Sequence, residues 1–509
     1  MRSHLSGRAL HGVHRSPHRR RATTAGFAAL FLTAGTLASG PAHADELPLS
    51  EMVTAEAIEA HLVNLNTIAE YNGGNRATNT PGYDVAALYV EDQLERAGYE
   101  PYRHEYEYEA WRTLTPTVLA RTTPEKTSYE EGEHFETMSY SGSGSVRGAK
   151  VTAVATDTAE SGCLPEQFAD FPEGHIALVK RGSCPFGEKV QNAADAGASA
   201  ALVYNNEDEL FTGTVGTESD VPAIGVSGAL GEELNASTRH LRLKVEVDAS
   251  ITTESSYSIL ADTPGGKDDN VVVVGGHLDS VEDGPGINDN GSGTAFLLET
   301  ARQLAAQGED PNNKVRFAFW GTEESGLVGS TEYVEGLSEQ ELDDLALYLN
   351  FDMIGSNNYG RFVLDGRMEL PGSVGAPSGS GAIAKVFEDY FEEQGQVSEP
   401  GELSGRSDYL AFMVAGIPSG GLFSGGDGTK TEEQAEWYGG EAGKTFDPYY
   451  HTPDDNLENI NWDSVAELSA AGAHGVEFLA ETTLPVNGVV PFSAPAEVEP
   501  LRKGDAWLR

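Results

Sequence analysis

The chain has 509 residues, of which 33 are Lys or Arg and 80 are Asp or Glu, so its formal net charge at pH 7 is −47. Hydrophobic residues make up 39% of the composition, and their periodic runs indicate a folded core rather than a disordered acidic protein. A negative charge of this size excludes nucleic acid as a natural partner, because the phosphate backbone would be repelled.

The first 44 residues have the composition of a signal peptide. They contain six Arg and no Asp, Glu or Lys, and the arginines at 19–21 precede an apolar stretch over residues 22–37. A small-x-small cleavage pattern ends at Ala44. Because the apolar stretch is shorter than a membrane span, we expect cleavage after Ala44, secretion and no stable membrane insertion. The arginines leave twin-arginine export open beside general secretion.

Removing this leader makes the chain more acidic. It leaves 27 basic and 80 acidic residues, a net charge of −53, with only 11 lysines. Such a charge keeps a protein soluble but makes it repel itself at low salt. We interpret it as a halophilic adaptation to a saline environment, with an ordinary acidic secreted protein as the alternative.

The mature chain begins with a segment of mixed character. Residues 55–71 and 83–98 have helical patterns, the second ending at Gly98. Residues 103–111 alternate between apolar and polar side chains, as in a strand. We assign residues 45–121 to the first part of the main domain.

Residues 122–250 follow a different pattern. Apolar runs at 176–179 and 200–204 are typical of short strands, and residues 186–196 between them of a helix. The strings HIALVKRGSCPFGEKVQNAADAGASAALVYN and VPAIGVS resemble a protease-associated (PA) domain. The resemblance implies an inserted β-rich module that restricts or docks substrates and carries no catalysis.

The only two cysteines, Cys163 and Cys184, lie in this inserted segment. An even pair in an exported protein favours one disulfide.

Five residues of metal-binding type stand in order in the second half of the chain. Apolar runs at 271–274, 315–320 and 345–350 are typical of buried strands, and each ends shortly before an acid or a histidine. A Gly-rich loop opens a helix over 294–307, and the last motif follows residues 446–450. Because ligands bind at the carboxyl ends of strands in open α/β sheets, these loops are expected to converge. The candidate ligands are His277, Asp289, Glu324, Asp352 and His451.

The ligand types indicate the metal. Two imidazoles and three carboxylates without a thiolate suit Zn²⁺ in a catalytic site. Five side chains exceed the usual three for one catalytic zinc, and a carboxylate that bridges two ions about 3.5–4 Å apart resolves the count. The His-Glu-x-x-His and His-x-x-Glu-His patterns of single-zinc proteases are absent from the sequence. We therefore expect two Zn²⁺ per chain.

The strings GGHLDSV, GINDNGSG, GTEESGLVGS, FDMIG and YHTPDD resemble the M28 family of zinc aminopeptidases, of the bacterial secreted leucine-aminopeptidase type. The similarity runs from about residue 62 to residue 480. It implies an α/β fold with a mixed, largely parallel sheet flanked by helices, in a domain split into residues 45–121 and 251–482. The Pro-rich tail, 483–509, is expected to be irregular. Peptide substrates are the expected partners of a chain that acts as a monomer.

The resemblance also implies a role for each ligand. Asp289 would bridge the two zinc ions. His277 and Asp352 would complete one site, and Glu324 and His451 the other.

Four more residues receive roles beside the metals. Glu323 would be the general base, since it can take a proton from the nucleophilic water and return it to the leaving amine. Asp279 resembles the carboxylate that accepts the second imidazole N–H of the first ligand. Tyr450 resembles the phenol that hydrogen-bonds the reacting oxygen, although an ordinary core tyrosine is equally consistent. Arg406 would steady the substrate backbone or, alternatively, form an ion pair with Asp408 or a neighbour.

An apolar substrate pocket is expected beside the metals. Met353 and Phe423 could line it, or could be ordinary core residues. Together with the resemblance, these two side chains predict an aminopeptidase that removes large apolar residues, leucine-like first, from the N-terminus of peptides. One departure concerns the last ligand loop, where Tyr449 and Asp454 stand in place of the cysteines that flank it in close secreted relatives.

Two other functions remain as alternatives. The first is a catalytically inactive receptor on the same scaffold, which would have lost ligands, whereas this chain keeps all five and Glu323. The second is carboxypeptidase or glutaminyl-cyclase chemistry. A carboxypeptidase needs several cations for the substrate carboxylate, and a cyclase of this fold typically uses one zinc.

Overall fold

The computed structural model describes residues 47–488 except 207, 209 and 212. The predicted signal peptide and residues 489–509 of the predicted tail lie outside the described residues. Among the described helices, none combines the length and apolar composition that crossing a membrane requires.

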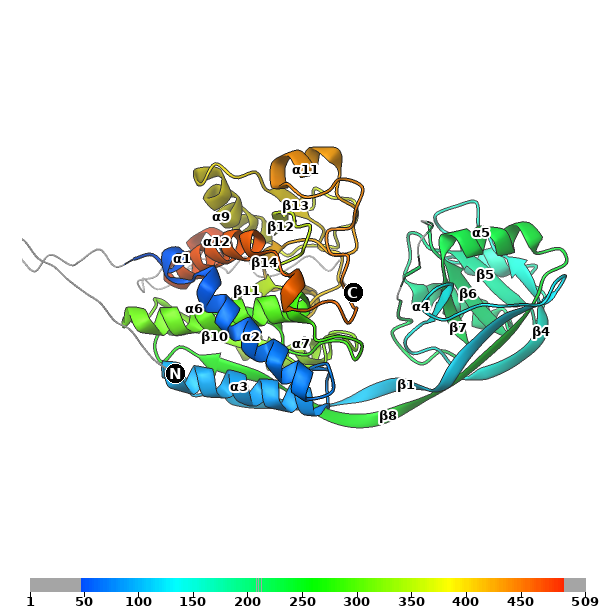
Figure 1. Cartoon of the computed structure of the whole chain (residues 1–509), viewed down its shortest axis with the longest axis horizontal. Helices are drawn as coiled ribbons and strands as arrows, with labels where there is room; N and C mark the ends of the chain where they lie inside the picture. The colour runs from blue at the N-terminus through cyan, green and yellow to red at the C-terminus, as the bar shows by residue number, and fades with distance from the viewer. Residues whose placement is uncertain (1–46, 207, 209, 212, 489–509) are drawn as a thin grey trace, which may run out of the picture. The chain divides into compact units, whose positions relative to one another are not determined.

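A mixed sheet forms the centre of the main domain (Figure 1). Strand β9 (Lys267–His277) pairs in parallel with β10 (Asn313–Trp320) on one side and with β11 (Leu345–Phe351) on the other. Strand β14 (Ser419–Phe423) continues the parallel arrangement beyond β11. The side chains of β9 from Asn270 onward are buried, as expected for an apolar strand covered on both faces.

The edges of this sheet are less regular. Strand β12 (Phe362–Leu364) is antiparallel to β14 and parallel to β13 (Glu399–Gly401). At the opposite side, the end of β8 (Arg242–Asp262) is antiparallel to β10. The predicted mixed, largely parallel sheet is confirmed.

Helices cover both faces of the sheet, and alternate residues of β9 pack against the two layers. Val272 and Val274 join the core of the larger layer, whereas Val271 and Val273 join the smaller one. The larger layer consists of α2 (Ala55–Tyr71), α3 (Pro81–Ala97), α6 (Gly293–Gln307), α9 (Ser380–Glu393) and α12 (Trp462–Glu481). The smaller layer contains α7 (Val328–Gly336), α8 (Glu339–Asp344) and α10 (Tyr409–Val414). Short helices α1 (Leu49–Met52) and α11 (Glu432–Tyr438) complete this part.

Local sequence signals explain the ends of the first two long helices. Thr54 and Thr80 accept hydrogen bonds from backbone N–H groups of the first turns of α2 and α3. Helix α3 ends at Gly98, whose φ of 97° favours glycine.

A long antiparallel ribbon joins the main domain to the inserted segment. Strand β1 (Tyr102–Thr123) pairs with β8 from Tyr102 opposite Leu260 to Thr123 opposite Arg242. The strand predicted over 103–111 therefore continues well beyond residue 111, because β8 supplies hydrogen-bond partners where the apolar alternation fades. The proposed boundaries at 121/122 and 250/251 fall inside these two strands.

The inserted segment extends the same sheet beyond β8 and has its own cores. Alternate residues of its central strands pack on opposite faces, with Leu178 and Leu202 in one core and Val179 and Val203 in the other. The strands are β2 (Thr127–Ser128), β3 (Phe135–Thr137), β4 (Gly144–Ala153), β5 (Ile176–Lys180), β6 (Ala200–Tyr204) and β7 (Ala223–Val226). The helices are a 3-10 turn (Pro165–Phe168), α4 (Phe186–Asp195) and α5 (Gly228–Ser237).

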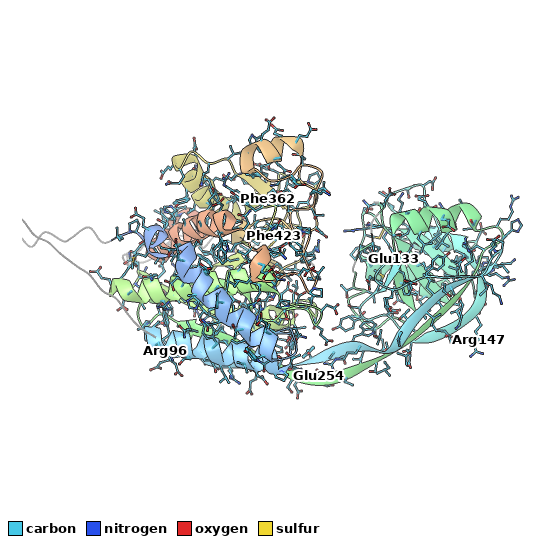
Figure 2. All side chains as sticks on the ribbon, in the orientation of Figure 1. Arg96, Glu133, Arg147, Glu254, Phe362 and Phe423 are labelled. Atoms are coloured by element: carbon cyan, nitrogen blue, oxygen red, sulfur yellow. A yellow bond between two sulfur atoms is a disulfide. The ribbon has the colours of Figure 1, made fainter. Side chains whose placement is uncertain are left out.

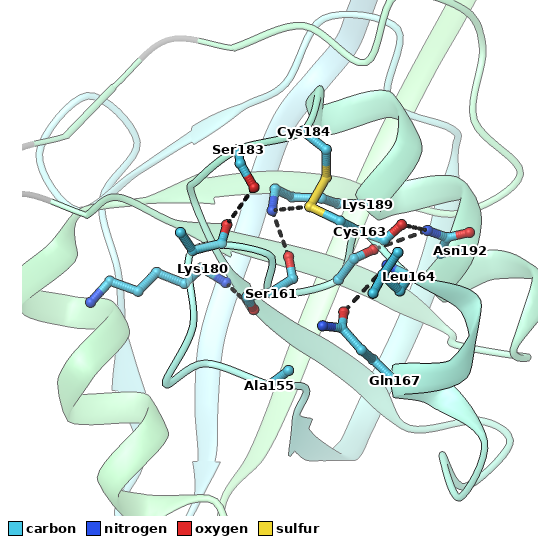
Figure 3. The surroundings of a disulfide bond; sticks show 12 residues. Ala155, Ser161, Cys163, Leu164, Gln167, Lys180, Ser183, Cys184, Lys189 and Asn192 are labelled. Atoms are coloured by element: carbon cyan, nitrogen blue, oxygen red, sulfur yellow. Dashed lines mark hydrogen bonds between the residues drawn. A yellow bond between two sulfur atoms is a disulfide. The ribbon is translucent and has the colours of Figure 1, made fainter. Parts of the chain in front are cut away.

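The predicted disulfide is present between Cys163 and Cys184 (Figure 3). A buried lysine, Lys189, lies against it and donates a hydrogen bond from Nζ to the Ser161 carbonyl oxygen at 2.5 Å. Its Nζ is 3.4 Å from Cys163 Sγ. The disulfide thus ties the loop before β5 to the start of α4.

The first residues of the predicted irregular tail differ from expectation. Helix α13 (Leu484–Asn487) begins just after Thr483, whose hydroxyl accepts a hydrogen bond from Asn270 Nδ2 at 2.8 Å. Val486 is fully buried. The tail pattern missed this helix because its stability comes from packing on the main domain rather than from local sequence.

Candidate metal centre

The predicted ligands come from loops at one end of the parallel sheet. His277 ends β9, Glu324 follows β10 by four residues, and Asp352 directly follows β11. Asp289 lies in the irregular turn over Ile287–Ser292 that precedes α6. His451 lies in the loop before the 3-10 turn Leu457–Asn459. Parallel strands present their carboxyl ends on the same edge, so the topology explains why the loops meet.

The five residues form two groups that share Asp289, and a third group brings His277 together with Glu323 and Glu324. In the first group, His277 Nε2 is 3.1 Å from Asp289 Oδ1 and 3.4 Å from Asp352 Oδ1. In the second, His451 Nε2 is 3.0 Å from Asp289 Oδ2 and 3.0 Å from Glu324 Oε2. Each carboxylate oxygen of Asp289 therefore faces a different histidine.

The donor atoms fit metal ions. Glu324 Oε1 and Asp352 Oδ1 are buried and make no hydrogen bond with any described residue, and His451 Nε2 faces two carboxylate oxygens. Buried polar atoms are normally satisfied, and a cation at each group would satisfy these. Neutral imidazoles and carboxylates within reach of one another are the donors that catalytic zinc takes.

The charges of the site couple metal binding to protons. Burial lowers the pKa of His451, but the facing carboxylates Glu324 and Asp289 outweigh burial and raise that pKa to about 10. Burial favours the protonated form of Asp289, yet the two facing histidines hold its pKa well below the ordinary value. A metal ion must displace the proton from each histidine, so the affinity for metal falls in acid.

Asp279 has a different role from the predicted one. The Nδ1–H of His277 donates to the backbone carbonyl oxygen of Asp279 at 3.0 Å, and the carboxylate oxygen lies farther away, at 3.8 Å. This carboxylate instead accepts the N–H groups of Glu323 at 3.2 Å and Glu324 at 3.3 Å. The nearer acceptor of the imidazole N–H in this structure is thus the backbone oxygen, and this tautomer turns Nε2 of His277 toward the other proposed ligands.

Glu323 lies beside the first group without belonging to the pair that shares Asp289. Its Oε2 is 4.0 Å from His277 Nε2, and the residue is buried. Burial raises the pKa of Glu323 well above the ordinary value, and the nearby carboxylates, Glu324 first, raise it further. A carboxylate in this position, beside the proposed ligands, is placed to exchange a proton with a group bound at the centre.

Tyr450 and Arg406 lie next to each other at the second group. The ring of Tyr450 stacks on that of His451 with centroids 3.8 Å apart. Arg406 Nη2 donates to the Tyr450 hydroxyl at 3.4 Å, and its Nη1 pairs with Asp427 at 3.1 Å. The ion pair of Arg406 is thus with Asp427 rather than Asp408, which is buried.

The two predicted pocket residues lie near each other. A Cβ on Gly426 would be 3.5 Å from Phe423 Cζ and 3.9 Å from Met353 Cε, so both side chains converge at this glycine. Figure 2 shows Phe423 beside Phe362, and their ring centroids are 6.3 Å apart. Met353 is buried and Phe423 partly buried.

Sequence reasoning missed two groups of supporting contacts. Ser407 Oγ donates to the ligand Asp352 at 2.6 Å. Asp447 accepts the N–H of Tyr449 at 2.9 Å and the side-chain amide of Asn288 at 2.5 Å, which ties the His451 loop to the Asp289 loop. These hydrogen bonds occupy the region where the sequence lacks a covalent brace. Asp447 lies three residues before the YHTPDD string, and this closeness is the only sequence signal for its contacts.

Comparison with known proteins agrees with this geometry. Residues 258–475 match the model of peptidase family M28, and residues 148–234 match that of the PA domain. An aminopeptidase of Pseudomonas aeruginosa is 44% identical over 449 residues, which span 86% of this chain and 83% of the relative. A probable lipoprotein aminopeptidase of Mycobacterium tuberculosis is 40% identical over 89% of this chain and 90% of its own length.

A solved structure shares the arrangement. The aminopeptidase from Aneurinibacillus sp. strain AM-1 superposes with a TM-score of 0.66 at 26% identity, over 84% of this chain and 94% of that chain. The identities and the coverage confirm the resemblance carried by the five ligand strings. The chain therefore belongs to peptidase family M28, as an aminopeptidase that carries a PA domain.

Proposed function

We propose that this protein is a secreted aminopeptidase with two zinc ions, which removes large apolar residues, leucine-like first, from the N-terminus of peptides. The observation that carries the proposal is the shared position of Asp289, whose two oxygens lie 3.1 and 3.0 Å from the histidines of two separate ligand groups. The zinc aminopeptidase of Bacillus subtilis, at 24% identity and a TM-score of 0.59, shares the fold.

The residues divide the chemistry among them. Zinc ions held by the two groups would polarise the scissile carbonyl and lower the pKa of the attacking water. Glu323 is placed to accept the proton of that water and deliver it to the leaving amine, since its Oε2 lies 4.0 Å from His277 Nε2, beside the proposed ligands. The Tyr450 hydroxyl, next to Arg406, can donate a hydrogen bond to the carbonyl oxygen as negative charge develops there.

The acidic character of the site favours a substrate with a free ammonium group. Glu323, beside the first group, and Asp352, one of its ligands, are the carboxylates that would hold this charge, and Arg406 is already paired with Asp427. A carboxypeptidase would need free cations for the terminal carboxylate. The side chains of Met353 and Phe423 offer an apolar wall for the N-terminal residue.

Hydrolysis of a matched set of p-nitroanilides tests the proposal. We expect leucine to be released fastest, alanine and glutamate more slowly, and N-acetyl-leucine hardly at all, because acetylation removes the ammonium charge. Faster release from the acetylated compound would refute the exopeptidase assignment, whereas a preference for glutamate would refute only the apolar pocket.

Elemental analysis of the same preparation tests the metal count. We expect about two zinc atoms per chain. A value near one in a fully active enzyme would refute the dinuclear site, and a folded chain that takes up zinc but hydrolyses none of the four compounds would favour the receptor alternative.

A further inference from the structure

A buried arginine outside the ligand set contacts the loop that carries Asp289. Arg76 lies between α2 and α3 and is fully buried. Its Nη1 donates to the carbonyl oxygen of Pro285, and its Nη2 donates to that of Gly286 at 3.1 Å. These two carbonyl groups directly precede the turn that presents Asp289. The guanidinium fork therefore fixes the direction in which this turn begins.

Asp455 holds the same loop through its N–H groups. One carboxylate oxygen accepts the N–H of Asn288 at 2.7 Å, and the other accepts the N–H of Asp289 at 3.0 Å. The backbone oxygen of Asp455 accepts the N–H of Ile287 at 3.1 Å. Asp455 is buried and follows His451 by four residues, so these bonds join the loop of the shared ligand to the loop of His451.

The charge of Arg76 is held in place by the acidic groups of the centre. Burial lowers the pKa of Arg76 to about 10, which still leaves the side chain a cation at neutral pH. The surrounding acids, Asp455 first, favour that charged form, although burial also raises the pKa of Asp455, to about 8. A buried guanidinium without such partners would cost several kcal/mol. The position of Arg76 therefore depends on the carboxylates around the centre, as their arrangement depends on Arg76.

We propose that Arg76 and Asp455 act together as positioning residues, here called the Arg76–Asp455 clamp, which hold Asp289 between the two metal sites. Arg76 donates hydrogen bonds to the carbonyl groups of the loop, and Asp455 accepts hydrogen bonds from its N–H groups. The inference rests on the proposed dinuclear function. A clamped loop keeps both oxygens of Asp289 facing the histidines before metal arrives, so binding does not have to order the loop.

Zinc affinity in three variants and one control tests the clamp. Arg76→Met removes both donors, Arg76→Lys keeps the charge without the fork, and Asp455→Asn replaces one acceptor oxygen by an amide nitrogen. The control, Arg361→Lys, alters another buried arginine whose fork binds Glu467 at 2.7 and 3.0 Å, outside the clamp. Zinc dissociation constants come from competition with a chelator, the ligand geometry from the visible absorption of the Co²⁺-loaded protein, and folding from the melting temperature of the metal-free protein.

We expect Arg76→Met and Asp455→Asn each to weaken zinc binding by about 10–100-fold and to change the Co²⁺ spectrum, with Arg76→Lys in between. A double variant that combines Arg76→Met with Asp455→Asn should lose less affinity than the product of the two single losses, because both residues fix one loop. Arg361→Lys should lower the melting temperature without changing zinc affinity or the spectrum.

The outcomes separate the clamp from the proposed function. A folded wild-type chain that binds no zinc refutes the proposed function and the clamp with it. If the wild type binds two ions and both Arg76→Lys and Asp455→Asn bind them within about twofold of the wild type, with an unchanged Co²⁺ spectrum, the clamp alone is refuted. These two conservative variants decide the question even if Arg76→Met does not fold.

Discussion

The metal centre of the main domain and the inserted PA segment differ in the kind of side chain that they bury. At the carboxyl edge of the main sheet, many carboxylates and His277 are buried around Asp289, and several donor atoms make no hydrogen bond with described residues. The inserted PA segment instead buries aliphatic side chains on both faces of its sheet and is tied by one disulfide. The metal centre therefore carries a cost in stability that the aliphatic cores of the PA segment do not.

The largest effect is expected from a variant that removes the proposed general base and leaves the metal ligands in place. Glu323→Gln has nearly the same shape but cannot accept a proton, so we expect turnover to fall by about 10²–10⁴-fold or more. Zinc content should remain that of the wild type, since Asp289 and the ligand pairs are untouched. Kinetics on leucine p-nitroanilide and elemental analysis on the same sample check this.

Asp289→Asn is the matched control for that variant. It should lose zinc as well as turnover, because the bridging carboxylate is damaged on both sides. Near-native turnover in Glu323→Gln would remove the base role, and equal zinc loss in both variants would make Glu323 a ligand instead.

The next effect should appear in the PA segment and leave the centre intact. Replacing Cys163 and Cys184 by Ser removes a link between two residues that lie 21 positions apart in the sequence. Because the disulfide restricts the unfolded chain, we expect its removal to lower the free energy of unfolding of this segment by about 3 kcal/mol. Urea unfolding followed by limited proteolysis of the PA segment measures the loss. Zinc content and turnover of folded protein serve as the control, and a matching fall in zinc affinity would mean that the two regions are not independent.

Salt should stabilise both regions together. The acidic residues outnumber the basic ones, 80 to 33, so screening removes more repulsion than attraction. The Debye length falls from about 10 Å at 0.1 M to about 3 Å at 1 M. We expect the melting temperature to rise by about 5 °C between 0.1 and 2 M sodium chloride, with turnover rising as well. Sucrose at matched osmolality is the control, and a flat or falling melting temperature in salt would contradict the halophilic interpretation.

The sequence predicted what local patterns encode. The strand of β9, the helix of α2 and the order of the five ligands were all legible, because buried strands, caps and Gly-rich turns have local signatures. The position of Arg76 and the true partner of His277 were not. Both depend on which backbone atoms happen to lie closest once distant loops meet, and no local pattern records that distance.

The full length of the β1–β8 ribbon was not predicted for the same reason. Strand β1 continues to Thr123 because β8, more than a hundred residues later, supplies its hydrogen bonds. The helix α13 was missed for a similar reason, since its buried Val486 is stabilised by the main domain. What the sequence left open was therefore decided by tertiary contacts rather than by propensity.

The smallest expected effect compares the buried lysine of each region. Lys430 Nζ donates to the carbonyl oxygens of Tyr359 and Gly439, both at 2.8 Å, and three aromatic rings surround it. Burial lowers its pKa to about 8, and burial likewise lowers the pKa of Lys189 in the PA segment. Below pH 8 the folded and unfolded chains both carry the proton, and the full cost of burying the charge is present. Between about pH 8 and 10.5 the unfolded chain binds more protons than the folded one, so the stability contributed by Lys430 rises with pH.

Lys430→Met isolates this effect, since methionine keeps most of the side-chain volume without a charge. We expect the free energy of unfolding of the wild type, relative to Lys430→Met, to be constant below pH 7 and to increase above pH 8 by at most about 1.4 kcal/mol per pH unit. Lys189→Met should show the same sign in the PA segment. The control is Lys385→Met, because Lys385 is exposed and paired with Asp389, which raises its pKa and removes any gain in this window. Urea unfolding at pH 6 to 10 measures each difference, and a difference for Lys430 that stays flat or falls above pH 8 would mean that its ammonium group remains charged in the folded protein, held by the two carbonyl groups and the rings.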